Sequence, residues 1–505
     1  MTGIALATIN ARYMHASLGL RCLYANLGDL RQHCRVMEFT LNERPADIAE
    51  RLLSEAPRIV GLGVYIWNTA TSTQVVKLIK RIRPQTIVVL GGPEVSYEHE
   101  EQDIVHAADY VVTGMADLAF ANLCERVLDG HPPDEKIISP AELDLRDLRL
   151  PYDHYDSADL SERLTYVEAS RGCPFKCEFC LSALDRTAWA FPLDVFLGEM
   201  AKLLSRGARH FRFVDRTFNL KKASTIAILE FFLERMSDDL FLHFELIPDR
   251  LPDAVRDLII RFPPGSLQFE IGVQTFTPEV QALISRRQDN EETLRNLRWL
   301  RLDTHAHIHA DLIFGLPGET LESFRDSFDQ LVAAEPHEIQ VGILKRLRGS
   351  PIVRHTQTHD LRFNPDPPYN ILATDRIDFS AMQSMSRFAR YFDLIINSGR
   401  FETARPLLLG DAPFDNFFAL SEWLFAATGQ THRIALGRLF DLIRRGASER
   451  LGIPVGALAS ALDHDQARLR RAHERSRRHA AKPLTPHTTR QTRHQQAGRE
   501  LNHEH

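Results

Sequence analysis

Three cysteines that fall within eight residues could hold a metal centre. Cys173, Cys177 and Cys180 have the spacing C-x3-C-x2-C. Soft thiolates this close together select zinc, copper or an iron–sulfur cluster. Most iron–sulfur clusters take four cysteines, so three of them favour a cluster with one iron left open for a cofactor or substrate.

A structural zinc site is the alternative to a cluster. Such a site normally takes four protein ligands. The nearest histidines, His154 and His210, are distant in sequence, and no second cysteine pair follows. The zinc interpretation therefore lacks a fourth ligand, although the sequence does not exclude it.

Two series of strands and helices must position these residues. In the first, short β-branched runs alternate with helical patterns such as Leu18–Leu30 and Thr73–Ile82. This alternation predicts a five-stranded, doubly wound (Rossmann-like) α/β domain over residues 1–135. Its expected strands are Ile4–Ile9, Arg35–Phe39, Ile59–Tyr65, Thr86–Leu90 and Tyr110–Thr113.

The second series predicts a partial (β/α)6 barrel over residues 164–369. The three cysteines follow its first strand and therefore lie at the carboxyl end of the strands, which is the catalytic face of such barrels. Helical segments such as 193–204, 225–235 and 321–334 separate the strands. The expected strands are Leu164–Ser170, His210–Asp215, Phe241–Ile247, Leu267–Val273, His307–Phe314 and Ile339–Leu344.

Three further segments complete the organisation. Residues 136–163 are rich in Pro, Asp and Leu without clear periodicity, so we expect a linker. Residues 370–462 have the pattern of a mostly helical, aromatic-rich domain. Residues 463–505 are rich in Arg, His and Gln with few apolar side chains, so we expect a disordered tail.

The cysteine spacing, with the aromatic Phe179 just before the last cysteine, resembles the signature of radical SAM enzymes. The resemblance implies a four-iron four-sulfur (4Fe-4S) cluster on Cys173, Cys177 and Cys180. It also implies that the open iron binds S-adenosylmethionine (SAM), whose reductive cleavage gives a 5′-deoxyadenosyl radical. The family's usual Gly-Gly-Glu after the second strand is absent here.

The same resemblance assigns roles to residues at the other strand ends. Asp215 ends the second strand, Glu245 lies on the third, Gln274 follows the fourth, and Gly315 to Glu319 follow the fifth. Family members often place groups that contact SAM or substrate at these positions. Turn glycines and a helix cap remain the alternative interpretation, above all for Glu319.

The amino-terminal domain resembles a cobalamin-binding domain. Gly63 and Tyr65 lie at the end of one strand, and Gly91 and Gly92 at the end of the next. In cobalamin domains small residues there make room for the cofactor, although any α/β sheet has glycines after its strands. The lower-ligand motif Asp-x-His-x-x-Gly is incomplete around His15, so we expect no histidine ligand to the cobalt.

The order of domains resembles cobalamin-binding radical SAM proteins with a carboxyl-terminal helical domain of unknown function. This resemblance implies a cobalamin-dependent radical SAM enzyme, with methyl transfer to an unactivated carbon as one reaction. A cyclase or rearrangement enzyme is the nearest alternative. An RNA methylthiotransferase would need three cluster cysteines at amino-terminal strand ends, whereas Cys22 and Cys124 lie in helical patterns and Cys34 lies near a helix end. A zinc-stabilised binding protein is a further alternative.

Composition sets limits on partners and compartment. The chain has 505 residues and a formal net charge of -6, which gives no overall attraction to nucleic acid. We expect no secretory signal, no membrane span of about 18 apolar residues, and a cytoplasmic protein. The expected partners are a small-molecule substrate and an electron donor of the flavodoxin or ferredoxin type.

Overall fold

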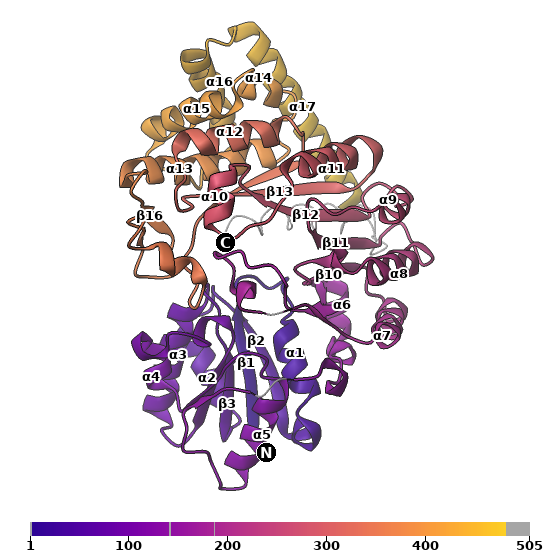
Figure 1. The fold of residues 1–505 in the computed structure, drawn as a ribbon, viewed down its shortest axis with the longest axis vertical. Helices are drawn as coiled ribbons and strands as arrows, with labels where there is room; N and C mark the ends of the chain where they lie inside the picture. Colours follow the sequence, from indigo (N-terminus) through magenta and orange to yellow (C-terminus); the bar gives the residue numbers. More distant parts are fainter. Residues whose placement is uncertain (1–2, 141–142, 186, 481–505) are drawn as a thin grey trace.

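The computed structural model describes residues 3–140, 143–185 and 187–480. Two six-stranded parallel sheets form its framework. The amino-terminal sheet lies at the bottom of Figure 1, the barrel strands lie above it, and a helical region covers the far end of the barrel. The predicted fold class, two α/β units followed by a mostly helical region, is confirmed.

The amino-terminal sheet has the strand order β2-β1-β3-β4-β5-β6. Helices cover both of its faces, so the central strand β1 is buried along its whole length. Apolar side chains of α2 (Pro45–Leu53) and α3 (Thr69–Ile82) pack on one face, and those of α1 (Leu18–Ala25) and α5 (Asp117–Leu128) pack on the other. The strands are β1 (Ile4–Asn10), β2 (Cys34–Thr40), β3 (Ile59–Gly63), β4 (Ile87–Gly91), β5 (Tyr110–Val112) and β6 (Ile137–Ile138).

The second sheet is an open barrel with the order β14-β13-β12-β11-β10-β7. Side chains alternate along β12 (Leu267–Gln274): Leu267, Phe269, Ile271 and Val273 are buried, while the intervening residues are partly exposed. The buried set joins the core under the outer helices, so the other set faces the inside of the barrel. The remaining strands are β7 (Thr165–Val167), β10 (His210–Phe213), β11 (Phe241–Leu246), β13 (His307–Phe314) and β14 (Glu338–Ile343).

The segment 136–163, expected to be a linker, contains regular structure. Its first residues form β6, so the amino-terminal sheet has six strands where the sequence predicts five. Tyr152 and Tyr155 are 1% exposed. Helix α6 (Ser157–Glu162) brings Asp159 within 2.6 Å of the buried Arg21 on α1. Its few apolar side chains are buried individually and not along one face of a helix or strand, so the sequence of the segment shows no periodic pattern.

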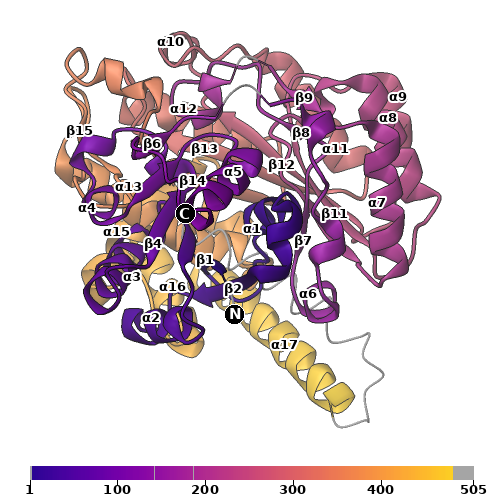
Figure 2. The same cartoon turned by 90° about the horizontal axis from the view of Figure 1, so that it is seen from below.

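The carboxyl-terminal region is helical, as predicted. Its main helices are α13 (Phe379–Phe392), α15 (Pro413–Thr428), α16 (Leu436–Leu451) and α17 (Val455–Ala480). Helix α17, the long yellow helix of Figure 2, continues through the first part of the segment that the sequence predicts to be disordered. Its Asp465 is buried and accepts the Thr403 and Ala404 amides at 3.0 and 3.1 Å. The rest of that prediction, from 481 onward, lies outside the described residues.

Between residues 3 and 480, leaving aside the short gaps, no helix combines the length and apolar character needed to cross a membrane.

Candidate active site

The three cysteines lie on a loop that begins directly after a short strand, β8 (Ser170–Arg171). Gly172 precedes Cys173 and has a φ of +87°, in the left-handed region that favours glycine. A Cβ at this position would also lie 2.5 Å from the carbonyl oxygen of Thr187. The turn that presents the first cysteine therefore requires glycine for two independent steric reasons.

All three cysteines line one pocket of about 260 Å³ at the carboxyl end of the barrel strands. Three of the predicted site residues, Phe179, Glu245 and Gln274, line the same pocket. The Gln274 backbone has a φ of +70°, which costs energy for a residue other than glycine. The structure thus brings together six side chains that are spread over about 100 positions of the sequence.

The donor set of this pocket suits a cluster better than a single ion. Each cysteine of a cluster binds a different iron, so the thiolates need not converge on one point. Among the described residues, no three His, Cys, Asp or Glu side chains converge closely enough to hold one metal ion. The described side chains that line the pocket include no histidine. The zinc alternative therefore still lacks a fourth ligand.

Arg286 is a functional candidate that the sequence does not reveal. It lines the cysteine pocket and donates through Nη1 to the Cys177 sulfur at 3.6 Å. Burial raises the pKa of the Cys177 thiol, and the guanidinium opposes that shift. Arg286 lies in a short segment after α10 (Pro278–Leu283), and nothing in its local sequence distinguishes it from the other arginines.

A group of inward-facing charges forms the inner wall of the pocket. Asp311 on β13 and Glu270 on β12 both line it. Arg216 lies 3.3 Å from Glu245. Burial raises the pKa of Glu245 to about 7, although Arg216 opposes the shift. The alternation of polar and apolar residues along β12 and β13 could have identified these positions from the sequence.

Asp215 does not line the cysteine pocket. Its carboxylate is 2% exposed and accepts the Ala169 amide at 2.9 Å and the Ser170 hydroxyl at 2.6 Å. Burial raises the pKa of Asp215 to about 7. The side chain thus fixes the backbone just before the cysteine loop.

Gly315 and Glu319 also lie outside the cysteine pocket. Glu319 is fully buried and accepts the Gly315 amide at 2.7 Å, and burial raises the pKa of its carboxyl to about 8. The helix-cap alternative also fails for Glu319, because Thr320 is the N-cap of α12 (Leu321–Val332). The buried Glu319 carboxyl therefore stabilises its own loop through a hydrogen bond with the backbone.

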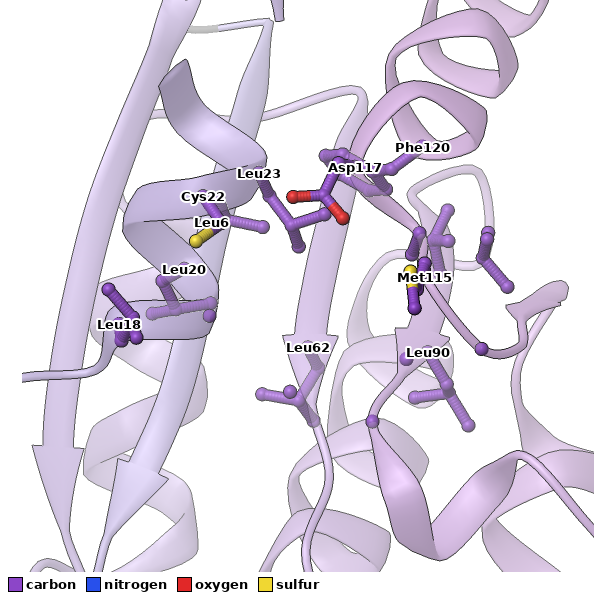
Figure 3. A pocket seen from close by; sticks show the side chains of 18 of the residues that line it. Leu6, Leu18, Leu20, Cys22, Leu23, Leu62, Leu90, Met115, Asp117 and Phe120 are labelled. Carbon is purple, nitrogen blue, oxygen red and sulfur yellow. The ribbon is translucent and has the colours of Figure 1, made fainter. Parts of the chain in front are cut away.

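A second pocket, of about 320 Å³, lies at the carboxyl end of the amino-terminal sheet. Gly63, Tyr65, Gly91 and Gly92 all line it, as the resemblance implies. Its apolar wall includes leucines from β1, β3, β4 and α1, together with Met115 and Phe120 (Figure 3). Gly92 has a φ of +109°, and a Cβ there would lie 2.4 Å from the Val64 carbonyl oxygen. Glycine at position 92 therefore lets the chain after β4 pack directly against the backbone after β3.

His15 does not belong to the described residues that line this second pocket. Its Nδ1 lies 2.6 Å from the Tyr166 hydroxyl of the barrel domain. The side chain thus joins the two α/β units.

The segment that leads into the cysteine loop reaches the amino-terminal pocket. Glu168 and Arg171, which lead into the cysteine loop, line the second pocket. Arg171 lies 2.6 Å from Glu168 and 2.8 Å from Asp117 at the start of α5. Its Nη2 also donates to the Cys22 sulfur at 3.4 Å. The chain that carries the cysteines therefore forms part of the wall of the amino-terminal pocket.

The three amino-terminal cysteines are not at the carboxyl ends of strands. Cys22 and Cys124 are buried on α1 and α5, and Cys34 is the first residue of β2. Burial raises the pKa of all three thiols. The positions that a methylthiotransferase needs for its second cluster are therefore not occupied by these cysteines.

Comparison with known proteins assigns three regions of the chain. Residues 4–124 match the B12 binding domain family, and residues 167–331 match the radical SAM superfamily. Residues 357–503 match a family of unknown function, DUF4080.

Several curated relatives match about half of the chain. The cobalamin-dependent radical SAM methyltransferase TokK of Streptomyces tokunonensis is 25% identical over 325 residues, which are 57% of this chain and 47% of TokK. A tRNA-2-methylthio-N(6)-dimethylallyladenosine synthase of Thermotoga petrophila is 25% identical over 289 residues, 55% of this chain and 62% of that enzyme. The chain thus spans about half the length of the first of these curated relatives.

A solved structure supports the fold. The radical S-adenosylmethionine methyltransferase TsrM from Kitasatospora setae, with cobalamin and a [4Fe-4S] cluster bound, superposes with a TM-score of 0.61. The match covers 94% of this chain and all of TsrM, at 16% identity.

The pocket with three cysteines and the glycine-lined pocket each lie in the region that matches the corresponding family. The two families agree with the cofactors predicted from the sequence: the B12 binding domain with cobalamin, and the radical SAM superfamily with SAM and a 4Fe-4S cluster. The chain thus combines a B12 binding domain, a radical SAM domain and a carboxyl-terminal DUF4080 domain.

Proposed function

We propose that the enzyme is a cobalamin-dependent methyltransferase that acts on an unactivated carbon of a small molecule. The supporting observation is that Glu168 and Arg171, five and two residues before the first cluster cysteine, line the amino-terminal pocket. A substrate bound between the pockets would lie within reach of both cofactors. We further propose a cytoplasmic location and an electron donor of the flavodoxin or ferredoxin type.

In this proposal Cys173, Cys177 and Cys180 hold the cluster, which supplies an electron and an open iron for SAM. Arg286 offers its guanidinium to a carboxylate, and Glu245 offers a carboxylate to an ammonium or hydroxyl group. SAM carries all three of these groups. The polar side chains of the pocket therefore match SAM in both charge and hydrogen-bonding type.

Gly63, Gly91 and Gly92 would let the amino-terminal sheet edge approach the cobalamin closely, and Tyr65 would lie against it. When bound, cobalamin supplies a carrier for the methyl group that SAM donates. The leucine-rich wall would exclude water from the carrier. No ionisable side chain is required for that role, and most of the wall has none.

The experiment is an anaerobic reaction of reconstituted protein with cobalamin, reductant and SAM carrying a deuterated methyl group. Both 5′-deoxyadenosine and S-adenosylhomocysteine should form, because one SAM supplies the radical and another supplies the methyl group. Omission of cobalamin should stop S-adenosylhomocysteine formation.

Formation of 5′-deoxyadenosine alone, with cobalamin bound and each candidate substrate present, would contradict methyl transfer. It would favour the cyclase or rearrangement alternative on the same scaffold. A product that gains both sulfur and a methyl group would instead support methylthiotransferase chemistry.

A further inference from the structure

A short segment that follows β14 contacts loops beside both cofactor pockets. We call residues 345–355 the strap. It ends in a short 3₁₀ helix, Pro351–His355. The segment belongs to neither pocket, since the strap residues are absent from the described linings of both.

The first half of the strap binds the loop after β4 in the amino-terminal domain. Arg348 donates through Nε to Glu94 at 3.1 Å and through Nη1 to Glu98 at 3.4 Å. Arg346 Nη2 and the Gly349 amide also donate to Glu98, both at 3.0 Å. The Glu94 and Glu98 carboxylates of the amino-terminal domain thus accept hydrogen bonds from two guanidinium groups and one backbone amide of the strap.

The part of this contact around Glu94 is buried and closely packed, whereas Glu98 and Arg346 are partly exposed. The Glu94 side chain is 3% exposed, and the Tyr369 hydroxyl donates to it at 2.6 Å. A Cβ on Gly349 would lie 2.4 Å from Cγ of Tyr97, so the strap backbone packs directly on that ring. Buried ion pairs cannot lose one partner without a large cost, so this contact resists separation.

The second half of the strap binds the loop that carries the cluster cysteines. Glu178 follows Cys177 directly, and its side chain is 3% exposed. The Ile352 amide donates to the Glu178 carbonyl oxygen at 2.9 Å. The Glu178 carboxylate lies 2.8 Å from Nε2 of His355 and also pairs with Arg354.

The two contacts are close together along the strap. Arg348 and Ile352 are four residues apart, so their Cα atoms are separated by at most about 14 Å. Glu94 is two residues after Gly92 of the amino-terminal pocket. The strap therefore connects a residue adjacent to one pocket with a residue adjacent to a cluster cysteine.

We propose that the strap is a positioning element that fixes the cysteine loop and the β4 loop relative to each other. Its purpose rests on the proposed function, because one substrate atom must lie within reach of both cofactors. The mechanical coupling itself is a property of the polypeptide and does not depend on which reaction the enzyme performs.

Amide hydrogen exchange of the full-length protein tests this coupling. One contact of the strap is weakened by a substitution, and exchange is measured in the loop that the other contact holds. Arg348→Met removes the contact with Glu94 and Glu98, and exchange is read in a peptide covering 175–184. Arg354→Met weakens the contact with Glu178, and exchange is read in a peptide covering 93–102. We expect each remote peptide to exchange at least about fivefold faster, the lower range of coupling between sites.

Two further variants serve as controls. Arg387→Met breaks an Arg–Glu pair of similar length, with Glu422, inside the helical region, and should leave both peptides unchanged. Tyr369→Phe removes the hydrogen bond to Glu94 and the one that the hydroxyl accepts from Arg348, but it keeps the Arg348–Glu94 ion pair. It should give a smaller effect of the same sign if Arg348→Met proves unstable.

Faster exchange confined to the substituted end in both variants would overturn the proposal. The measurement uses protein both with and without cofactors. Absence of coupling would leave the proposed methyl transfer standing, and absence of methyl transfer would leave the coupling standing.

Discussion

Substitution of the buried Glu319 by glutamine should remove a pH dependence of stability. The carboxyl is fully buried, and burial raises its pKa to about 8 from an ordinary value of 4.5. Because the folded pKa is the higher one, the folded state binds the proton more tightly. The stabilisation is complete below about pH 4.5 and is lost as the pH rises through about 8.

The magnitude follows from the two pKa values. With pKa values of 4.5 and about 8, ionisation of Glu319 destabilises the folded wild type by about 1 kcal/mol at pH 5 and about 3 kcal/mol at pH 7. The free energy of unfolding of wild type relative to Glu319→Gln should therefore fall by about 2 kcal/mol between these pH values. The amide oxygen of glutamine can still accept the Gly315 amide, so the loop keeps its hydrogen bond.

The assay is denaturant unfolding of both proteins at a series of pH values, followed by circular dichroism. Glu322→Gln is the matched control, because that carboxylate is three residues away and its side chain is 77% exposed. It should track the wild type at every pH. A constant difference between wild type and Glu319→Gln from pH 5 to pH 8 would refute a buried, protonated Glu319.

Further outcomes follow for the two cofactor sites. Gly92→Ala should reduce cobalamin retention by at least about tenfold, because its Cβ would clash with Val64 at a positive φ; unchanged retention in equilibrium dialysis would contradict this. His15→Ala should leave the electron paramagnetic resonance spectrum of bound Co(II) cobalamin unchanged, and nitrogen splitting that the variant loses would identify His15 as a ligand. Joint replacement of Cys22, Cys34 and Cys124 by Ala should leave about four irons per chain, as in the wild type. A fall from about eight irons in the wild type to about four in the variant would reveal a second cluster.

The sequence predicts the strands of both sheets well for a physical reason. Strands buried between two layers of helices are short apolar runs, such as Ile59–Gly63, that stand out against the amphipathic helices around them. Parallel strands place their carboxyl ends on one edge, so Gly63 and Gly91 could be assigned to one site without coordinates. The same reasoning places the cysteine loop at the end of the first barrel strand.

The roles of residues whose contacts depend on tertiary packing could not be predicted from the sequence. Glu319 and Asp215 are polar residues at strand ends, and only the structure shows that they turn into the core and bind backbone amides. Arg286 reaches Cys177 because a helix and its following loop fold back across the barrel end. β6 has two residues and no pattern of its own, so only its pairing with β5 identifies it.

The most direct measurement compares reconstituted wild type with single Ala variants of Cys173, Cys177 and Cys180 under reducing, anaerobic conditions with SAM. Wild type should bind about four irons, absorb broadly near about 400 nm as iron–sulfur chromophores do, and form 5′-deoxyadenosine. Each variant should lose the absorption and the product together. Reductive cleavage of SAM by a variant that lacks all three cysteines would contradict the assignment of the cluster to these residues.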